Sequence, residues 1–409
     1  MPLRTVALIH YSAPPVVGGV ESVLAQHARL MSRAGHQVRV IAGRGEAWAL
    51  ERGVRLVALP VIDSLHPRVL AVKAALDRGE VPPEFGPLSA EIFEALTEAL
   101  GGAKVVFAHN VCSLHKNLPL TAALRLLCAQ GTGGRWVLWH HDLAWTTPRY
   151  QPELHDGFPW DLIRQDWGVL HVAVSEARRA ELIALLGLAD DRSLVIPNGV
   201  DPAAFLKLGP EAQSLARAVG WVRGWPRLLL PVRITPRKNI ELALRALAAL
   251  RDEYPQAALV VTGPPGPHNP ENATYFDALR RLRDDLELGA SAHFLAEHAP
   301  GYIPDEVIFD FYRMADALLL TSREEGFGIP LVEAGLSRLP VFCADIPSLR
   351  ALGMEEARYF SPDADPRHIA RLLAEHFRQD RVARFAARAW REFTWEGIYQ
   401  GRIAPLLES

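Results

Sequence analysis

The chain has 409 residues, about twice the length that one hydrophobic core usually organises, which predicts two domains. Its composition is 49% hydrophobic and 22% charged, without a low-complexity tract, which excludes a disordered tail or linker protein. The formal net charge of -3 gives no case for binding nucleic acid or an anionic membrane.

The three cysteines, Cys112, Cys128 and Cys343, have no paired or metal-ligand spacing. This pattern suits structural thiols in a reducing compartment. The chain starts with an apolar run at 5–10 that lacks the basic region of a secretory leader, and no apolar stretch reaches the roughly 18 residues of a membrane span. We therefore expect a cytoplasmic protein without stable membrane insertion. The oligomeric state stays open, and a homodimer is compatible with the sequence.

Short apolar runs alternate with helical patterns in the first half, as is typical of βαβ units in a parallel sheet. This alternation predicts one doubly wound domain at 1–205. The expected strands are 5–10, 37–42, 54–58, 105–109, 136–139, 171–174 and 193–196, and the expected helices are 21–34, 90–100, 119–129 and 176–186.

The same alternation restarts after a turn-rich stretch at 197–201 and predicts a second domain at 206–394. Open α/β sheets bind ligands at the carboxyl ends of their strands, so we expect two α/β, Rossmann-like domains that face a shared cleft. The expected strands are 228–232, 258–262, 293–295, 317–320 and 341–344, and the expected helices are 240–253, 273–286, 305–315, 330–337 and 366–390.

Two glutamates, Glu325 and Glu333, flank a Gly-x-Gly turn and an expected helix start at Pro330. Proline suits a first helical turn, and the glycines let backbone N–H groups approach an anion at the positive end of the helix. Carboxylates accept hydrogen bonds from vicinal hydroxyls, so one glutamate is expected to hold a sugar and the other a ribose. The alternative, a helix entry with acidic surface residues, is disfavoured because other motifs accompany this one.

A second motif at 233–239 directly follows the expected strand 228–232. Arg233 and Lys238 place two cations at the carboxyl end of a strand, where they can neutralise a diphosphate leaving group. A metal ion does this work in other enzymes, so we expect no obligatory metal or other cofactor. Arg237 is interpreted as an ordinary solvated residue at a helix start.

Weaker motifs lie in the first half of the chain. Gly18 and Gly19 permit close backbone approach to a ligand, with a flexible turn as an equal alternative, and the missing Gly-x-Gly-x-x-Gly counts against a nicotinamide enzyme. His140, His141 and Asp142 follow the expected strand 136–139. Because neighbouring strand residues point to opposite faces, only one histidine can enter the site, which disfavours a His-His-Asp metal site. A packed structural histidine is the alternative to one working imidazole.

Together, the Glu325-x7-Glu333 motif, the two cations, the glycine pair and the turn at 197–201 closely resemble glycosyltransferase family 4, the retaining GT-B enzymes. The resemblance covers nearly the whole chain, and the two-glutamate motif is its specific part. It implies that the final segment, about 395–409, packs back on the first domain.

By this resemblance, Glu325 contacts the donor sugar, Glu333 grips the ribose diol, and Arg233 and Lys238 hold the diphosphate. His141 looks like the histidine that touches the sugar near the reacting carbon, although the doubled histidine leaves the register open. The implied catalytic group is His141, Arg233, Lys238 and Glu325. The other implied donor contacts are Gly18 and Gly19, which close over the diphosphate, and the backbone of Gly326, Phe327 and Gly328.

The sequence offers no obvious pair of carboxylates such as retaining hydrolases use. The resemblance implies a front-face displacement instead, in which the departing phosphate oxygen takes the acceptor proton and fixed cations stabilise its charge. The expected reaction moves a hexose from a nucleotide-diphosphate sugar, of the UDP-glucose or GDP-mannose type, to a hydroxyl. The alternatives are a nucleotide-sugar epimerase and a catalytically silent nucleotide-sugar-binding protein. The two-glutamate motif speaks against the first, and the complete set of cations and carboxylates against the second.

The acceptor is expected to be a small, soluble, anionic molecule that binds the first domain. Lys116, one of five lysines, follows His109 and Asn110 in a loop after the strand 105–109, and Arg149 lies further along the chain. Together they could receive a carboxylate or phosphate, with a solvated loop lysine as the alternative. The helix 21–34 carries few cations, which argues against docking on an anionic membrane.

Overall fold

The computed structural model describes residues 3–266, 271–299 and 301–408. The chain forms two compact units, an N-domain of Met1–Gly199 and Trp395–Ser409 and a C-domain of Val200–Thr394. The first boundary lies earlier than the expected 205, because Val200 already pairs with the end of the C-domain. Its N–H donates to the carbonyl of Phe393 at 2.7 Å, and it forms a parallel bridge with Thr394.

The N-domain contains a parallel sheet of seven strands in the order β3-β2-β1-β4-β5-β6-β7. Alternate residues of β1 face opposite sides, since Val6 and Leu8 join one buried cluster and Ala7 and Ile9 join another. All seven expected strands are present, as β1 (Thr5–Ser12), β2 (Gln37–Arg44), β3 (Arg55–Ala58), β4 (Val105–His109), β5 (Arg135–His140), β6 (Leu170–Ala173) and β7 (Ser193–Val195).

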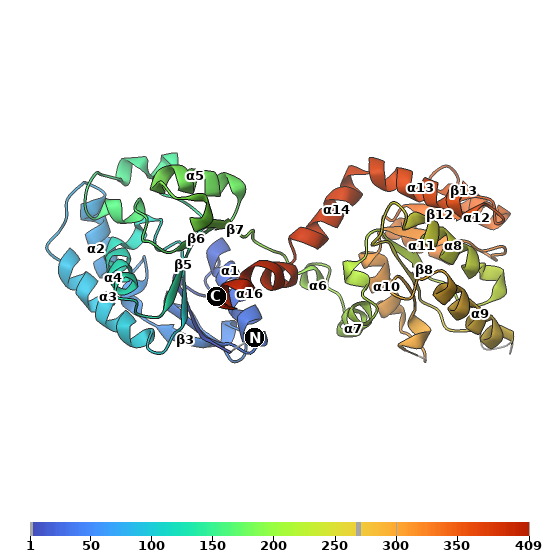
Figure 1. Ribbon diagram of the computed structural model, residues 1–409, viewed down its shortest axis with the longest axis horizontal. Coiled ribbons are helices and arrows are strands. Elements are labelled where there is room, and N and C mark those ends of the chain that lie inside the picture. Colours follow the sequence, from blue (N-terminus) through green and yellow to red (C-terminus); the bar gives the residue numbers. More distant parts are fainter. Residues whose placement is uncertain (1–2, 267–270, 300, 409) are drawn as a thin grey trace. The chain divides into compact units, whose positions relative to one another are not determined.

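Helices cover both faces of this sheet (Figure 1). The helix α1 packs on one face, and α2, α3 and α4 pack on the other. The N-domain helices of the first half are α1 (Gly19–Arg33), α2 (Pro67–Leu76), α3 (Phe85–Ala99), α4 (Leu118–Ala129) and α5 (Glu176–Leu186), of which α2 was not expected.

The end of the chain returns to the N-domain as α15 (Trp395–Ile398), a π-helical turn (Tyr399–Ile403) and α16 (Ala404–Glu408). Apolar residues from all three elements are buried in the same cluster as α1. Two arginines fasten the segment, since Nη1 of Arg135 donates to the carbonyl of Leu406 at 2.9 Å and Nη1 of Arg402 donates to that of Val195 at 2.8 Å.

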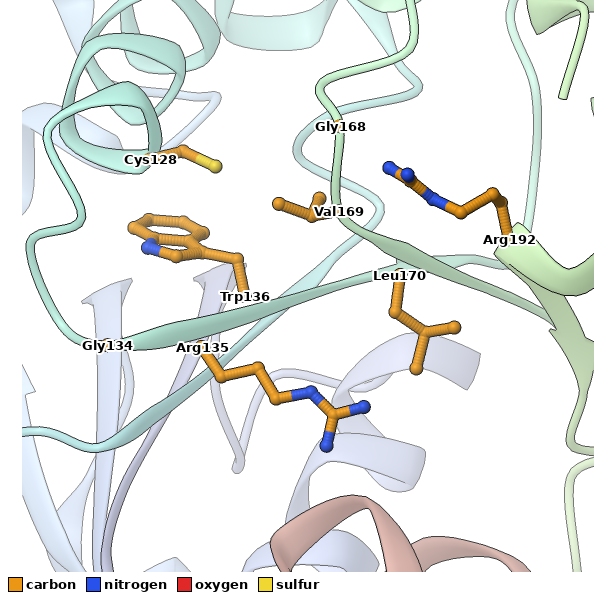
Figure 2. A pocket seen from close by; sticks show the side chains of 8 residues that line it. All are labelled: Cys128, Gly134, Arg135, Trp136, Gly168, Val169, Leu170 and Arg192. Carbon is orange, nitrogen blue, oxygen red and sulfur yellow. The ribbon is translucent and has the colours of Figure 1, made fainter. Parts of the chain in front are cut away.

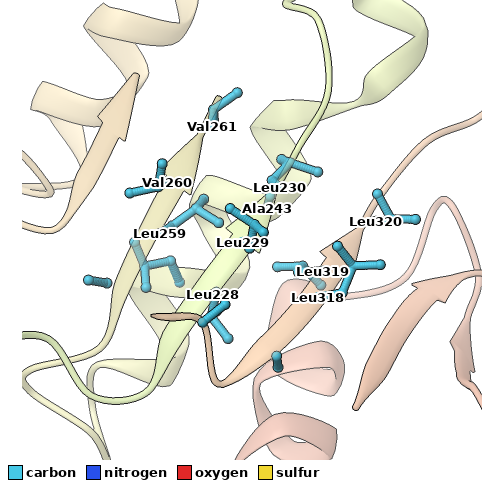
Figure 3. Close-up of a cluster of buried hydrophobic side chains, with 14 of the residues drawn as sticks. Leu228, Leu229, Leu230, Ala243, Leu259, Val260, Val261, Leu318, Leu319 and Leu320 are labelled. Atoms are coloured by element: carbon cyan, nitrogen blue, oxygen red, sulfur yellow. The ribbon is translucent and has the colours of Figure 1, made fainter. Parts of the chain in front are cut away.

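The C-domain contains a parallel sheet of six strands in the order β10-β9-β8-β11-β12-β13. Its central strands are continuous apolar runs because both faces are buried, as Figure 3 shows for β8, β9 and β11. The strands are β8 (Arg227–Leu230), β9 (Ala258–Val261), β10 (Ala292–Phe294), β11 (Ala317–Leu320), β12 (Val341–Ala344) and β13 (Arg358–Phe360), and only the short edge strand β13 was not expected.

The expected helix 366–390 is two helices in the structure. The carboxylate of Asp380 accepts hydrogen bonds from the N–H groups of Val382 at 2.8 Å and Ala383 at 3.0 Å, so it caps a new helix and ends the first. The C-domain helices are α6 (Pro202–Phe205), α7 (Pro210–Ala218), α8 (Ile240–Leu250), α9 (Glu271–Asp285), α10 (Asp305–Met314), α11 (Ile329–Leu336), α12 (Pro347–Gly353), α13 (Pro366–Gln379) and α14 (Arg381–Glu392).

Both domains are Rossmann-like, since each sheet continues to either side of its first strand, β1 or β8. The predicted α/β class of two doubly wound domains is confirmed, whereas the shared cleft stays a prediction. Among the described residues, none of the helices combines the length and apolar character needed to cross a membrane. Each switch point, next to β1 and next to β8, marks where the domain is expected to bind its ligand.

Candidate functional site

Two loops leave the carboxyl ends of the paired strands β8 and β11 in the C-domain. The first, 231–239, contains a single 3-10 turn, Pro236–Lys238, and the second, 321–328, leads into α11. Hydrogen bonds join them, because Thr321 Oγ1 donates to the carbonyl of Lys238 at 3.0 Å and the N–H of Arg323 donates to the carbonyl of Arg237 at 2.8 Å. The cation motif and the carboxylate motif therefore form one surface.

The ammonium of Lys238 is bound to the carboxylate of Glu325 within that surface. Nζ lies 2.5 Å from Oε1, and the side chains are only 9% and 8% exposed. Ser322 Oγ donates to the same oxygen at 2.7 Å. Burial lowers the pKa of Lys238, and its hydrogen bond to Glu325 opposes that shift. Two residues that were expected to hold different parts of the donor thus hold each other.

The two arginines of the cation motif, Arg233 and Arg237, differ in their contacts. Arg233 is exposed, and its guanidinium has no hydrogen bond or ion pair with the residues that the structure describes. Arg237 is exposed as well, as interpreted from the sequence, but its Nη1 also donates to the carbonyl of Glu324 at 3.1 Å and lies 3.8 Å from Oε2 of Glu325. Arg233 is therefore available to a ligand, and Arg237 links the two loops.

The turn before α11 leaves its backbone accessible. Gly328 has a φ of 102°, and a Cβ there would lie 2.6 Å from Cδ2 of Leu349. A Cβ on Gly326 would meet nothing within 4 Å, and Phe327 is 58% exposed. Pro330 lies in the first turn of α11, as expected. Together these features leave an open approach to the N-terminus of a helix, where an anion is favoured.

Glu333 lies on α11, as expected, and is bound by a residue that the sequence did not single out. The hydroxyl of the buried Tyr312, on α10, donates to Oε2 of Glu333 at 2.5 Å. Burial and the neighbouring carboxylate raise the pKa of Tyr312, which keeps it a donor. No contact of Oε1 of Glu333 appears among the described residues, so this oxygen can accept a ligand hydroxyl.

The two histidines at the end of β5 in the N-domain have different surroundings. His140 is buried, and its Nε2 lies 3.0 Å from Nδ1 of His171 on β6. His141 follows the strand end and is half-buried. Burial, with a smaller contribution from His10, lowers the pKa of His141 to about 4, so its imidazole is neutral near pH 7. Of the pair, His141 is therefore the residue that a ligand can reach.

Two buried residues from the end of β4 support His141. Asn110 Oδ1 accepts hydrogen bonds from the N–H groups of His141 at 2.8 Å and Asp142 at 3.1 Å. Nδ1 of His109 lies 3.5 Å from Nε2 of His141. His109 and Asn110 are 0% and 2% exposed, so their contacts favour positioning of His141 over the predicted direct contact with the acceptor.

The glycine pair lies at the start of α1, with Gly18 as the residue before the helix and Gly19 as its first residue. The carboxylate of Glu21 packs against it, because a Cβ on Gly18 would lie 2.0 Å from Oε2 of Glu21. Ser12 Oγ donates to Oε1 of Glu21 at 2.6 Å, and His10 Nε2 lies 3.7 Å from that oxygen. Burial raises the pKa of Glu21, but the contacts with His10 and Ser12 lower it to about 2, so the turn carries a carboxylate.

The residues predicted to bind the acceptor lie on two segments of the N-domain that touch. The ring of His115 contacts that of Tyr150, with centroids 5.1 Å apart. Lys116 is half-buried and has no ion pair within the described parts of the chain. Arg149 is exposed, and Nη2 donates to the hydroxyl of Tyr150 at 2.8 Å. The structure thus brings the two loops together, and the binding role of both cations stays a prediction.

Three side chains in and near these segments are of the types that bind metal ions and lie close together. Ligand atoms of Asp77, His115 and Glu153 lie within 4.8 Å of one another. The ammonium of Lys73 lies 2.7 Å from Asp77 Oδ2 and 2.8 Å from Glu153 Oε2. A cation of the chain itself therefore already pairs with both carboxylates.

A pocket of about 360 Å³ lies at the amino-terminal ends of the N-domain strands, where β5 and β6 begin (Figure 2). Arg135, Trp136, Leu170 and Arg192 are among its lining residues. His141 follows the opposite, carboxyl end of β5. The pocket therefore shares no residue with the predicted site.

Sequence inspection missed Ser322, Tyr312, His10 and Ser12. A usable signal exists for His10, Ser12 and Ser322. Each is a polar residue at, or just after, the carboxyl end of a buried parallel strand. Tyr312 carries no such signal, since it lies among apolar residues of α10.

Family models match both domains of the chain. The model described as Glycosyltransferase Family 4 matches residues 17–204, and the model described as Glycosyl transferases group 1 matches residues 217–390. The second match contains both the cation motif and the two-glutamate motif.

The chain is also similar to individual proteins. A D-inositol 3-phosphate glycosyltransferase of Kineococcus radiotolerans is 31% identical over 55% of this chain and 53% of its own length. The serotype-specific mannosyltransferase WbdA of Escherichia coli is 28% identical over 46% of this chain and 23% of its own length. A sucrose-phosphate synthase structure from Thermosynechococcus elongatus is 18% identical, with a TM-score of 0.40 and 99% of both chains covered.

The chain therefore spans about half the length of the first relative and less of the second. The two family models together extend over both Rossmann-like domains and include the residues of the candidate site. The chain belongs to glycosyltransferase family 4, the group 1 glycosyltransferases of the GT-B class.

Proposed function

We propose that this glycosyltransferase is a retaining hexosyltransferase that moves a hexose from a nucleotide-diphosphate sugar to a hydroxyl of a small anionic acceptor, without an obligatory metal. The observation that carries the proposal is the joint placement of Lys238 and Glu325 at the carboxyl ends of β8 and β11, with the exposed Arg233 on the same loop as Lys238. A cation for the leaving group and a carboxylate for the sugar lie side by side.

Charge development on the leaving diphosphate is the main demand of this chemistry. Arg233 and Lys238 supply two fixed positive charges, and the accessible backbone at 326–328 adds N–H groups at a helix N-terminus. These groups act in the way that a divalent cation acts in other transferases. The proposal therefore assigns diphosphate binding to them and sugar binding to Glu325.

The nucleoside is assigned to Glu333. Tyr312 fixes one oxygen of this carboxylate, and the other can accept a hydrogen bond from a ribose hydroxyl. This contact is the same in the ground state and the transition state, so it contributes to binding more than to rate.

The N-domain is assigned the acceptor side of the reaction. His141 is neutral and partly accessible, so it can exchange a hydrogen bond with a sugar hydroxyl without a change of charge. Lys116 and Arg149 offer positive charge on adjoining loops, and one relative is named for an inositol phosphate. A phosphate-bearing or carboxylate-bearing polyol fits this arrangement.

A donor screen tests the proposal. Thermal stability is measured with UDP, GDP, ADP and their glucose and mannose conjugates, and the best donor is then offered with phosphorylated and unphosphorylated polyols. Transfer to an acceptor supports the proposal. Epimerised donor without transfer would show an epimerase, and binding without any turnover would show a silent binding protein.

A further inference from the structure

The ion pair between Lys238 and Glu325 cannot persist unchanged if both residues bind the donor. Nζ of Lys238 is 2.5 Å from Oε1 of Glu325, and both side chains are nearly buried. An ammonium and a carboxylate in such surroundings each need a partner, because an unpaired buried charge is strongly unfavourable. A ligand that takes one of them must therefore leave the other without its partner or satisfy it too.

We propose that donor binding exchanges the partners of this ion pair, and that its re-formation after sugar transfer promotes release of the nucleoside diphosphate. The intact donor supplies phosphate oxygens to Lys238 and hydroxyl donors to Glu325. The product supplies only the phosphates. This inference rests on the proposed function and adds a means by which the site distinguishes substrate from product.

Two neighbouring contacts make Glu325 a competitor for Lys238. Ser322 donates to Oε1 of Glu325 at 2.7 Å, and Arg237 lies 3.8 Å from Oε2, so the carboxylate is held toward the ammonium. Burial lowers the pKa of Lys238, whereas Glu325 counteracts the shift. When a nucleoside diphosphate occupies Lys238, Glu325 keeps Ser322 and Arg237 but loses the ammonium, so the loss of this ion pair opposes product binding.

The first experiment compares the affinity of the wild type and Glu325→Gln for the nucleoside diphosphate among UDP, GDP and ADP that the wild type binds best. Because glutamine cannot hold the ammonium as an ion pair, we expect about tenfold tighter binding, or about 1.4 kcal/mol. Turnover should fall in the same variant, since the sugar contact is altered. Unchanged or weaker binding of the diphosphate would overturn the partner exchange.

Glu324→Gln is the matched control. Glu324 is exposed on the same loop, and its carboxylate has no contact with the part of the chain that the structure describes. Glu324→Gln removes the same charge from the loop but leaves the ion pair of Lys238 intact. We therefore expect less than a twofold change in diphosphate affinity. A tenfold gain here as well would reduce the effect to loop charge and refute the proposal.

A double-mutant cycle shows whether the gain operates through Lys238. In a Lys238→Ala background, Glu325→Gln should change diphosphate affinity less than twofold, because no ammonium remains to be released. An equal gain in both backgrounds would indicate simple repulsion and contradict the proposal. If Glu325→Gln does not fold, Glu325→Asp, with a shorter reach to Nζ, should give a smaller gain of the same sign.

The outcomes also separate this inference from the proposed function. If the wild type binds a nucleoside diphosphate and transfers sugar but Glu325→Gln binds no tighter, only the partner exchange fails. If the wild type neither binds any of the nucleotides nor transfers sugar, both fail.

Discussion

The hydroxyl of Tyr312 donates a 2.5 Å hydrogen bond to Oε2 of Glu333, so a buried side chain of α10 orients the carboxylate assigned to the ribose. Glu333→Ala should weaken nucleotide binding by about 2 kcal/mol, since hydrogen bonds to charged groups contribute roughly 1.5–3 kcal/mol. Tyr312→Phe should have a smaller effect of the same kind. Calorimetric titration with the preferred nucleotide measures both, and wild-type affinity in Glu333→Ala would rule out the ribose role.

Gly326 and Gly328 should respond differently to the same substitution. Gly328→Ala should cost about 1–3 kcal/mol of folding free energy, because its φ of 102° strains any residue with a Cβ and the methyl meets Leu349. Gly326→Ala should leave the free energy of unfolding within about 0.5 kcal/mol and still weaken nucleotide binding, because the methyl enters open space beside the helix N-terminus. Denaturant unfolding and nucleotide titration separate the two. Wild-type nucleotide affinity in Gly326→Ala would contradict a donor contact there.

His27 should make the protein sensitive to acid. It is fully buried against Trp139 and Trp395, and burial lowers its pKa from 6.5 to about 3. Since its folded pKa is the lower one, the unfolded state binds more protons between these values, and stability falls as pH drops below 6.5. His27→Leu should therefore stabilise the protein by about 2 kcal/mol more at pH 5 than at pH 7.5, at about 1.4 kcal/mol per pKa unit. Equal effects of the substitution on unfolding at both pH values would contradict this linkage.

Lys116 should recognise the charge of the acceptor. Lys116→Ala should raise the acceptor KM roughly tenfold, as expected for loss of a hydrogen bond to a charged group worth about 1.5–3 kcal/mol, with kcat little changed. Lys104→Ala is the control. This exposed lysine precedes β4 and so lies at the amino-terminal end of the strand, away from Lys116. An unchanged KM for the phosphorylated acceptor in Lys116→Ala would remove the proposed anion contact.

The strands were predictable because parallel strands buried on both faces read as short apolar runs, as Leu228–Leu230 does. β13 was not, since two of its three residues, Arg358 and Tyr359, are not fully buried. The helix α2 was missed because the exposed Leu70 obscures the spacing of Val69, Val72 and Leu76. The break at Asp380 depends on a capping hydrogen bond that the apolar period does not show.

The local sequence predicted the elements that carry the site but not the contacts within it. Pro330 and the glycines predicted the start of α11, and alternation along β5 predicted that His140 and His141 would differ. The pairing of Lys238 with Glu325 joins residues 87 positions apart and depends on β8 lying next to β11. Strand order sets such contacts, and the short apolar runs do not specify that order.

The stereochemistry of transfer in the presence of a chelator is the sharpest test of a retaining, metal-independent transferase. Proton NMR of the anomeric signals, recorded during turnover of the preferred donor and acceptor with excess EDTA, reports both the configuration of the new bond and the need for a metal. We expect sustained turnover and a product whose new glycosidic bond has the anomeric configuration of the donor. An inverted product, or activity lost on chelation and restored only by added metal, would contradict this expectation.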